Sequence, residues 1–580
     1  MGWETVKRWQ RPVFGLALGL LLASASTWIA FHGDFFAINN DGEIHLARME
    51  SIYQALHAGR LPSLVNFIGY SHRGTAMNAM YPWLTTMIFV VPRLLGANPI
   101  AALAVGFFLL NIVTLAGCYL LARQLTGSEL GRWLGVMVYQ FNAYHFQLMY
   151  TRVDLGEALG YAFLPLIMLG LFKIWQRDWR GTLWLGLGMG LVGNSHWLSL
   201  LLFTGTVMGL EAIRLCQHRI DWFELRSLLM SAGLALVLAS YSLVNSLTWM
   251  VHNRMVTPTP SLIPLDPTTG WTRLLQNDFA ESANGAHIGL AASLILLLLV
   301  SRLFSATSGS WRGWIVGAAA LLVIAQNWLP WRDLANTPLQ LLQFTMRLLT
   351  LVAMGLMIGV VLYFEQTKLP VSLTVWALSG FLIVIALTGV AQIREQTQTA
   401  EQWADRQPLT SGQQTRIIND DRHYLTTHNY QADLDAMTMA DYMLKKTDLT
   451  GIPVITKAEK QDLPVASRLN KLAVAFDNKA AAQFQYQGAN DEQVRFNSVQ
   501  KQAKLVKLPV VGYHHVNYQV TVNGHAVPYQ RSQGQLLAKL AAGQNQVTIS
   551  VAHNTKHGWW LCLSVLATLA TVVGLVWRRY

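Results

Sequence analysis

The chain has 580 residues, of which 52% are hydrophobic and only 13% are charged, about half of the roughly 25% charged fraction of soluble domains. This balance excludes a disordered chain and argues against an ordinary cytosolic enzyme. The formal net charge is +12, but the basic residues form short clusters between apolar segments, which argues against nucleic-acid binding. Apolar stretches of about 20 residues recur along the chain. The sequence therefore predicts a polytopic membrane protein.

The first apolar segment covers residues 13–30 and follows the basic residues Lys7, Arg8 and Arg11. It is predicted to cross the membrane with its start in the cytoplasm. Ala23-Ser24-Ala25 also resembles a signal-peptide cleavage site, and this alternative stays open. Both interpretations place the next segment outside the cell.

Segment 81–95 is apolar but short, and Pro82, Pro92 and Arg93 interrupt it. If it crossed the membrane, the basic clusters of the next loops would face outward. Because cytoplasmic loops collect Lys and Arg, we expect an interfacial helix instead. The predicted fold is then a polytopic α-helical protein of about twelve spans: 12–31, 99–121, 132–150, 158–175, 181–197, 198–215, 227–250, 286–304, 313–330, 340–364, 371–391 and 558–577.

These spans divide the chain into a transmembrane domain at 1–391, with a first external loop at 32–98, an external region at 392–556 and a final transmembrane segment at 557–580. Both termini are predicted to be cytoplasmic. The external region is expected to contain a helix near 432–446 and to end in a β-sandwich-like module. Asn523-Gly524 between two alternating apolar runs predicts a tight hairpin there. The three cysteines lie outside this region, so no disulfide framework is expected.

The first external loop holds the densest group of polar residues. Asn40 followed by Glu43 resembles a capping box, so a helix is predicted to start there. Asp41, His45 and Arg48 are spaced to share one face of that helix. Two explanations of Asp41 stay open: a helix-start carboxylate, or a catalytic base beside an arginine that holds an anion. A divalent cation at these acidic residues is a further alternative, although the spacing matches no known metal signature.

Three more polar sites are predicted on the outer side. Residues 150–157 form a turn with Arg152 and Glu157, which is either a solvated ion pair or part of a site. His196 marks another outer turn. Arg347 is predicted about two turns inside its helix, where it either snorkels to the interface or faces a polar cavity and a phosphate.

Taken in order, these patterns resemble a bacterial family. Asp41-Gly-Glu-Ile-His45, Gly59-Arg-Leu-Pro62 and Tyr81-Pro82 are similar to the first loop of multispan proteins labelled 6-pyruvoyl-tetrahydropterin synthase-related, which are close to the YfhO-type proteins. Tyr150-Thr-Arg152 with Gly156-Glu157 resembles their Tyr-x-Arg and Gly-Glu turn. Gln343-Phe-Thr-Met-Arg347 resembles their Gln-Phe-Pro-Trp-Arg, with Thr345-Met346 in place of Pro-Trp, which puts the expected helix irregularity in doubt.

The resemblance implies a GT-C-like glycosyltransferase in the bacterial cell membrane. It implies an inverting transfer of a sugar from a polyprenyl-phosphate carrier to a cell-envelope polymer or glycolipid. Asp41 would be the base, Arg48, Arg152 and Arg347 would contact the lipid phosphate, and His45, Glu157 and His196 would bind or orient substrate. No cofactor and no metal ligand are assigned. The alternatives are a transporter or flippase and a non-catalytic envelope-assembly scaffold.

Overall fold

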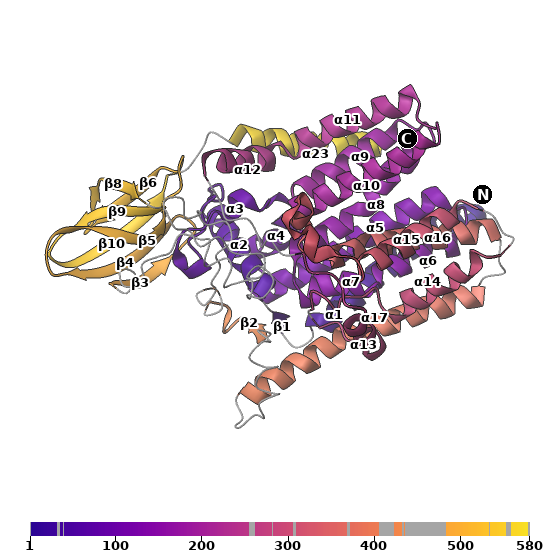
Figure 1. Ribbon diagram of the computed structural model, residues 1–580, viewed down its shortest axis with the longest axis horizontal. Helices are drawn as coiled ribbons and strands as arrows, with labels where there is room; N and C mark the ends of the chain where they lie inside the picture. Colours follow the sequence, from indigo (N-terminus) through magenta and orange to yellow (C-terminus); the bar gives the residue numbers. More distant parts are fainter. Residues whose placement is uncertain are drawn as a thin grey trace.

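The computed structural model describes residues 2–31, 35–38, 40–253, 262–280, 282–305, 309–367, 372–404, 423–431, 434, 483–532, 534–552 and 558–577. A long helical body carries a β-sandwich at one end (Figure 1). Its helices are α1 (Gly2–Phe31), α2 (Asn40–His57), α3 (Met77–Met80), α4 (Met87–Leu94), α5 (Pro99–Leu125), α6 (Glu129–Gln140), α7 (Ala143–Phe146), α8 (Leu155–Trp175), α9 (Arg180–Gly193), α10 (Trp197–Cys216), α11 (Trp222–Leu238), α12 (Ser240–His252), α13 (Pro267–Gln276), α14 (Leu290–Arg302), α15 (Trp311–Ile324), α16 (Leu349–Thr367), α17 (Ser372–Ala404) and α23 (Gly558–Trp577).

Short turns join several of these helices. Five are 3-10 turns: η1 (Tyr70–His72), η2 (Leu84–Thr86), η4 (Trp331–Asn336), η5 (Pro338–Leu342) and η6 (Thr345–Leu348). The sixth, η3 (Gln147–Thr151), is a π-helical turn. π-Helical turns are rare, and they occur frequently at functional sites.

Seven helices in the described part of the chain are long and apolar enough to cross a membrane: Phe14–Phe31, Pro99–Leu125, Leu155–Trp175, Trp197–Cys216, Thr345–Thr367, Val375–Thr397 and Gly558–Trp577. α11 and α12 add an eighth if they are taken together, but they meet at a bend of 72°. The expectation of about twelve spans is therefore not confirmed. Segment 81–95 contains only a short apolar helix, which agrees with the interfacial helix predicted there.

Besides 227–250, which is divided into α11 and α12, four predicted spans do not form one long helix. Segment 132–150 is divided into α6, α7 and η3, because the Asn142 side chain accepts a hydrogen bond from Tyr144 N at 3.0 Å and starts a new helix. Segments 181–197, 286–304 and 313–330 contain α9, α14 and α15, of 14, 13 and 14 residues. These helices are shorter than the roughly 20 residues that cross a bilayer. Apolar composition alone did not reveal these helix ends.

The β-sandwich consists of two sheets. One has the strand order β3-β4-β10-β6-β7 and the other β5-β9-β8. Alternating apolar residues of both sheets meet in a core that includes Phe496, Leu508, Val520, Leu536 and Ile549. The strands are β3 (Phe484–Ala489), β4 (Gln493–Gln500), β5 (Lys504–Val511), β6 (Tyr518–Val522), β7 (His525–Val527), β8 (Tyr529–Ser532), β9 (Gln535–Leu540) and β10 (Gly543–Val551).

The predicted hairpin joins β6 and β7. Asn523 and Gly524 have φ angles of 52° and 81°, the left-handed pair that a tight two-residue hairpin requires. The β-rich end of the external region is thus confirmed. The helix predicted near 432–446 lies outside the described residues, apart from Leu434.

Several contacts tie residues 392–556 to residues 32–98, among them a pair of strands and an ion-paired arginine. β1 (Phe35–Ile38) pairs antiparallel with β2 (His423–Thr426), so these two segments form a small sheet of their own. Arg60 pairs with Asp491 at 2.9 Å and with Glu492 at 2.9 Å, and so joins the loop to the β-sandwich.

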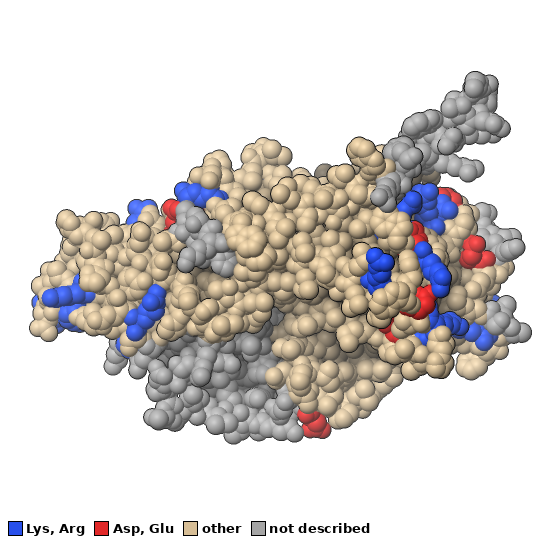
Figure 2. Space-filling view, turned by 90° about the horizontal axis from the view of Figure 1, so that it is seen from above, with Lys and Arg blue, Asp and Glu red and all other residues tan. Residues whose placement is uncertain are grey.

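The surface charge follows the long axis of the molecule. Figure 2 shows Lys, Arg, Asp and Glu gathered at the end of the helical body away from the β-sandwich, beyond a broad band with almost no charge on that face. The starting end of α1 and the final end of α23 lie toward this charged end (Figure 1). An uncharged band of this kind is typical of a surface that faces hydrocarbon.

Candidate active site

The first turns of α2 carry three predicted site residues. The helix begins at Asn40, as the sequence pattern predicts; the side chains of Asn40 and Glu43 lie outside the described part, so the capping box itself stays a prediction. Asp41 reaches the Arg152 guanidinium, with 3.5 Å between its Oδ2 and Nη2. One turn later, His45 Nδ1 accepts a hydrogen bond from Arg48 Nη1 at 2.9 Å.

Arg48 points toward Tyr81. Its buried guanidinium lies over the Tyr81 ring, 4.2 Å from the centroid. Its Nη2 donates to the carbonyl oxygens of Tyr81 at 3.2 Å and Pro82 at 2.9 Å. The expectation that Arg48 contacts a lipid phosphate stays a prediction, while its guanidinium here binds the backbone at 81–82.

The turn between η3 and α8 brings three charged residues together. Val153 has a φ of 53°, an unfavourable left-handed conformation for a β-branched residue. Asp154 follows with φ −77° and ψ 82°, and Leu155 N donates to Val153 O at 3.0 Å, which is an inverse γ-turn. Asp154 Oδ1 also accepts from Glu157 N at 3.0 Å and caps α8. The chain thus reverses within three residues.

Arg347 lies in η6, immediately before α16, and not two turns inside a helix as predicted. The irregularity exists without the proline of the family pattern: Gln343 has a φ of 60°, and Thr345 Oγ1 donates to Ala325 O and accepts from Leu265 N. Arg347 Nη1 donates to Leu342 O at 2.8 Å and to Gln343 Oε1 at 2.7 Å. The Arg347 Nε donates to Glu157 Oε2 at 3.1 Å.

Glu157 links the two arginines. Its Oε2 accepts from Arg152 Nη1 at 3.2 Å and from Arg347 Nε at 3.1 Å, and its Oε1 accepts from Tyr144 OH at 2.5 Å. Arg152 also pairs with Asp154, with Nη2 and Oδ2 3.2 Å apart. Both guanidinium groups lie within 6 Å of the Phe344 ring centroid. We call Asp41, Arg152, Asp154, Glu157 and Arg347 the acid–arginine cluster.

Tyr81 connects this cluster to the two histidines. Its hydroxyl donates to Asp154 Oδ1 at 3.2 Å. Its ring packs edge-on against His45 at 5.2 Å and stacks on His196 at 5.6 Å. His196 Nδ1 lies 2.9 Å from Ser199 Oγ. The structure therefore places both predicted histidines beside Tyr81, and His45 contacts Arg48 rather than Arg152 or Arg347.

The electrostatics distinguish the carboxylates. Burial among protein atoms raises the pKa of Asp41 to about 6, with Asp154 and Glu157 adding to the rise and Arg152 opposing it. Burial alone would also raise the pKa of Asp154, but Arg152 holds it well below its usual range. Burial lowers the pKa of His45 to about 3 and that of His196 to about 4, so both rings are neutral.

Sequence reasoning missed several members of this site. Tyr144, which donates to Glu157, was not noted at all. Gln343, which accepts from Arg347, and Tyr81 were noted only as parts of motifs, and Asp154 only lay inside the predicted turn 150–157. A Cβ built on Gly156 would lie 1.9 Å from the Tyr81 hydroxyl oxygen, which explains a glycine between Asp154 and Glu157. Among the described residues, no three His, Cys, Asp or Glu side chains are arranged to hold a metal ion.

Comparisons with known proteins give limited likeness. No family model and no curated protein matches the chain. Among solved structures, it is similar to arabinofuranosyltransferase AftD from Mycobacteria, at 16% identity and a TM-score of 0.41 over 67% of this chain. It covers only 26% of that protein.

Two other solved structures are similar over most of the chain. ArnT from Cupriavidus metallidurans bound to undecaprenyl phosphate is 10% identical with a TM-score of 0.33, over 91% of this chain and 98% of that one. Arabinosyltransferase EmbB from Mycobacterium smegmatis is 10% identical with a TM-score of 0.28, over 93% of this chain and 63% of that one. The activity must be argued from the site itself.

Proposed function

We propose that the protein is a membrane glycosyltransferase that moves a sugar from a polyprenyl-phosphate donor to a cell-envelope polymer or glycolipid on the outer face. The observation that carries the proposal is the meeting of one accessible carboxylate and two guanidinium groups in a single cluster. Asp41, Arg152 and Arg347 come from α2, the turn before α8 and the turn before α16. Transfer from a phosphate-linked donor needs a base that takes the proton of the acceptor hydroxyl and cations that stabilise the departing phosphate.

Asp41 is the carboxylate best suited to act as the base. Its side chain is 36% exposed, whereas those of Asp154 and Glu157 are 8% and 4% exposed. Its pKa of about 6 lies near neutral pH, where a general base is most effective. Asp154 and Glu157 instead anchor the guanidinium groups.

Arg152 is the proposed first contact of the donor phosphate. Three carboxylates surround it, and the contact with Asp41 is the longest of the three at 3.5 Å. A phosphate oxygen that replaced Asp41 at Nη2 would pair with Arg152 and free Asp41 for the acceptor. Glu157 would keep Arg347 alongside.

In the proposed step, the acceptor hydroxyl oxygen bonds to the anomeric carbon while the bond from that carbon to the phosphate oxygen breaks. The proton passes to Asp41, and the polyprenyl phosphate leaves with the electron pair, stabilised by Arg152 and Arg347. A single displacement of this kind inverts the anomeric configuration. His45, His196 and Arg48 would act through Tyr81, which they surround.

The proposal is tested by transfer in proteoliposomes. Purified protein is supplied with radiolabelled sugars on undecaprenyl phosphate and with a cell-envelope fraction. The assay is run with and without EDTA, because a divalent cation bound by the acidic residues of the first loop is one of the alternatives. The expected result is label transfer that Asp41→Asn reduces by at least about a hundredfold, the usual contribution of a general base.

Asp178→Asn is the matched control. Asp178 is also partly exposed and paired with one basic residue, Lys173 at 2.8 Å, but it lies in the α8–α9 loop outside the cluster. We expect its transfer rate to equal that of the unaltered protein. A folded Asp41→Asn protein that transfers sugar at the original rate would overturn the proposed mechanism.

A further inference from the structure

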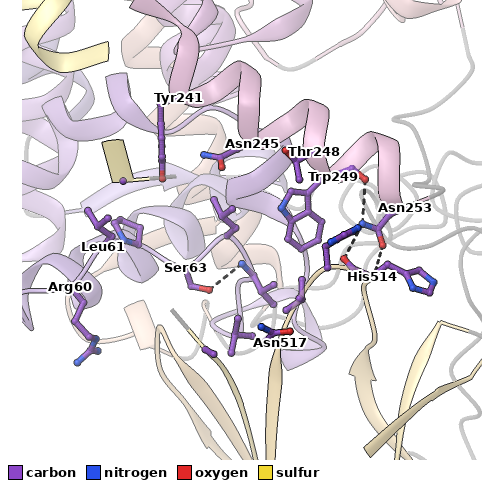
Figure 3. Close-up of a pocket in the computed structure, with 18 of the residues that line it drawn as sticks. Arg60, Leu61, Ser63, Tyr241, Asn245, Thr248, Trp249, Asn253, His514 and Asn517 are labelled. Atoms are coloured by element: carbon purple, nitrogen blue, oxygen red, sulfur yellow. Dashed lines mark hydrogen bonds between the residues drawn. The ribbon is translucent and has the colours of Figure 1, made fainter. Parts of the chain in front are cut away.

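A cavity lies away from the acid–arginine cluster, where the helical body meets the β-sandwich (Figure 3). Its volume is about 530 Å³, within the range of small-molecule sites. Three parts of the chain line it: residues 59–65 of the first external loop, one face of α12, and the β-sandwich residues 514–517 and 551–552. We call it the junction cavity.

The α12 face supplies aromatic and amide groups in one row. Tyr241, Asn245, Thr248, Trp249 and Asn253 follow at helical spacing and all line the cavity (Figure 3). The Trp249 ring packs edge-on against Tyr513 of the β-sandwich at 4.7 Å. Asn253 Oδ1 accepts from His514 N at 2.8 Å. The wall is thus held on both sides of the junction.

One polar atom in this wall needs a partner. Asn245 is only 2% exposed, and its carboxamide oxygen Oδ1 has no hydrogen-bond partner among the residues that the structure describes. Buried polar atoms are nearly always hydrogen-bonded, so an exception in a cavity wall indicates a missing donor. A hydroxyl group of a bound molecule would supply such a donor.

The charge of the cavity excludes an anionic ligand as the best fit. Arg60 is the one Lys, Arg, Asp or Glu among the described lining residues, and Asp491 and Glu492 already neutralise it. Among the described lining residues, which also include His514 and His515, a phosphate or carboxylate would meet no Lys or Arg other than the already paired Arg60. The aromatic rings and amides instead suit a neutral molecule with apolar C–H faces and many hydroxyl groups.

We infer that the junction cavity binds a short neutral oligosaccharide. Trp249 and Tyr241 provide surfaces for the C–H faces of the sugar rings, and Asn245 accepts a hydrogen bond from a sugar hydroxyl. This inference rests on the cavity alone. Under the proposed function the bound glycan is the acceptor.

A short segment separates the cavity from the acid–arginine cluster. The Trp83 ring packs edge-on against the cavity residue Tyr241 at 5.8 Å, while the Tyr81 hydroxyl contacts Asp154 of the cluster at 3.2 Å. Ser246 Oγ of α12 donates to Ala79 O at 2.8 Å, just before this segment. A glycan in the cavity would therefore lie one chain segment away from the proposed catalytic residues.

Binding is tested with the full-length protein in lipid nanodiscs on an array of neutral, acidic and phosphorylated oligosaccharides. We expect at least one neutral oligosaccharide to bind. Thr248→Phe fills the cavity from α12, and Asn245→Leu removes the amide at nearly constant volume. Each is expected to weaken binding by at least about tenfold, the effect of one lost hydrogen bond or of a blocked subsite.

Thr206→Phe on α10 is the matched control. Thr206 and Thr248 are both half-buried, and each donates to the carbonyl oxygen four residues earlier, at 2.8 Å and 2.7 Å. Thr206 does not line the cavity, so its substitution should leave binding unchanged. If both cavity variants fail to fold, a photoreactive form of the bound oligosaccharide must label residues 59–65 or 245–253 of the unaltered protein.

Three results would overturn the inference: binding of acidic or phosphorylated glycans alone, no glycan binding, or labelling elsewhere. Asp41→Asn separates this proposal from the proposed function, because Asp41 does not line the cavity. Glycan binding that persists in Asp41→Asn without sugar transfer supports both proposals. If Asp41→Asn still binds the glycan and still transfers sugar at the original rate, only the proposed catalytic mechanism is contradicted.

Discussion

Three carboxylates share two guanidinium groups in the acid–arginine cluster, so the charges do not balance when all five groups are ionised. The buried Asp154 and Glu157 make the shorter contacts with Arg152, at 3.2 Å each. Asp41 makes one longer contact and keeps 36% of its side chain exposed. Burial is the main reason that the pKa of Asp41 rises to about 6; the neighbouring Asp154 and Glu157 add to the rise, and Arg152 opposes it. Asp41 is therefore the carboxylate of the cluster that exchanges a proton near neutral pH.

The pH dependence of transfer should reflect this pKa. Asp41 accepts a proton only when it is deprotonated, so the transfer rate should rise with pH through about 6 and fall on the acid side. The measurement is the rate of sugar transfer between pH 4 and 8 in proteoliposomes of constant composition. An acid limb centred near pH 4, the value of an ordinary aspartate, would contradict the proposed role.

Stability should respond to the two aspartates in opposite directions. The pKa of Asp41 is raised by folding, so the folded state binds the proton more tightly, and stability falls as pH rises between the unfolded and folded values. Asp41→Asn removes this cost and should melt at the same or a higher temperature at pH 7. The pKa of Asp154 is lowered, so its ionisation stabilises the fold at neutral pH and this contribution is lost on acidification.

Asp154→Asn should therefore lower the melting temperature at pH 7. Its deficit should shrink only below about pH 4, where the aspartate of the unfolded chain takes up a proton. Thermal unfolding of the three proteins in the same detergent, at pH 7, 4.5 and 3, checks both signs. A lower melting temperature for Asp41→Asn than for Asp154→Asn at pH 7 would contradict the assigned environments.

At the scale of elements, the turn from η3 into α8 determines whether the cluster forms. Gly156 allows the Tyr81 ring to pack against the first turn of α8, where a Cβ would come within 1.9 Å of the Tyr81 hydroxyl oxygen. The ring cannot move freely, because His45, His196 and Arg48 surround it. Gly156→Ala should separate Tyr81 from Asp154 and reduce transfer by at least about tenfold, the effect of one buried hydrogen bond.

Gly205→Ala is the matched control for this change. Gly205 also lies in an apolar helix, α10, but no atom lies within 4 Å of a Cβ built there. The added methyl group should leave transfer unchanged and favour the helix slightly. Equal transfer rates for the two alanine variants would show that the contact between Gly156 and Tyr81 has no functional role.

The sequence predicted those parts of the site that depend on local pattern. The start of α2, the shared face of Asp41 and His45, and the Asn523-Gly524 hairpin all follow from capping, helical spacing and turn chemistry. Contacts between distant segments were not predictable in the same way. Arg48 lies on the same predicted helix face as Asp41, but its guanidinium donates to the carbonyl oxygens of Tyr81 and Pro82 instead.

The ends of the helices in the helical body could not be predicted from the sequence pattern either. Apolar composition predicts burial in lipid or protein equally well, so it could not separate a long span from the two short helices of segment 132–150. The pairing of β1 with β2 joins residues nearly four hundred positions apart, and the sequence of neither strand indicates which segment it pairs with.

At the scale of the whole molecule, the number of long helices bears on the alternative functions. Twelve spans were the feature that suited a transporter, and the described chain contains seven, or eight with the bent α11–α12 pair. The acid–arginine cluster forms where α2 meets the helical body, near the end that carries the β-sandwich (Figure 1).

The membrane orientation is the last test, because the proposed donor is used on the outer face. Loops α8–α9 and α10–α11 meet through the Arg177–Asp221 pair at the end away from the β-sandwich. Their arginines predict that this end is cytoplasmic. In a Cys562→Ser background, an impermeant maleimide should label Gln530→Cys of the exposed strand β8 in intact cells.

Native Cys216, exposed at the end of α10, should react only after permeabilisation. Labelling of Cys216 in intact cells, with Gln530→Cys protected, would place the β-sandwich and Asp41 in the cytoplasm. Cell-envelope acceptors outside the membrane could not then reach the base. The proposed transfer would fail however well the cluster is arranged, because the chemistry and its acceptor would lie on opposite sides of the bilayer.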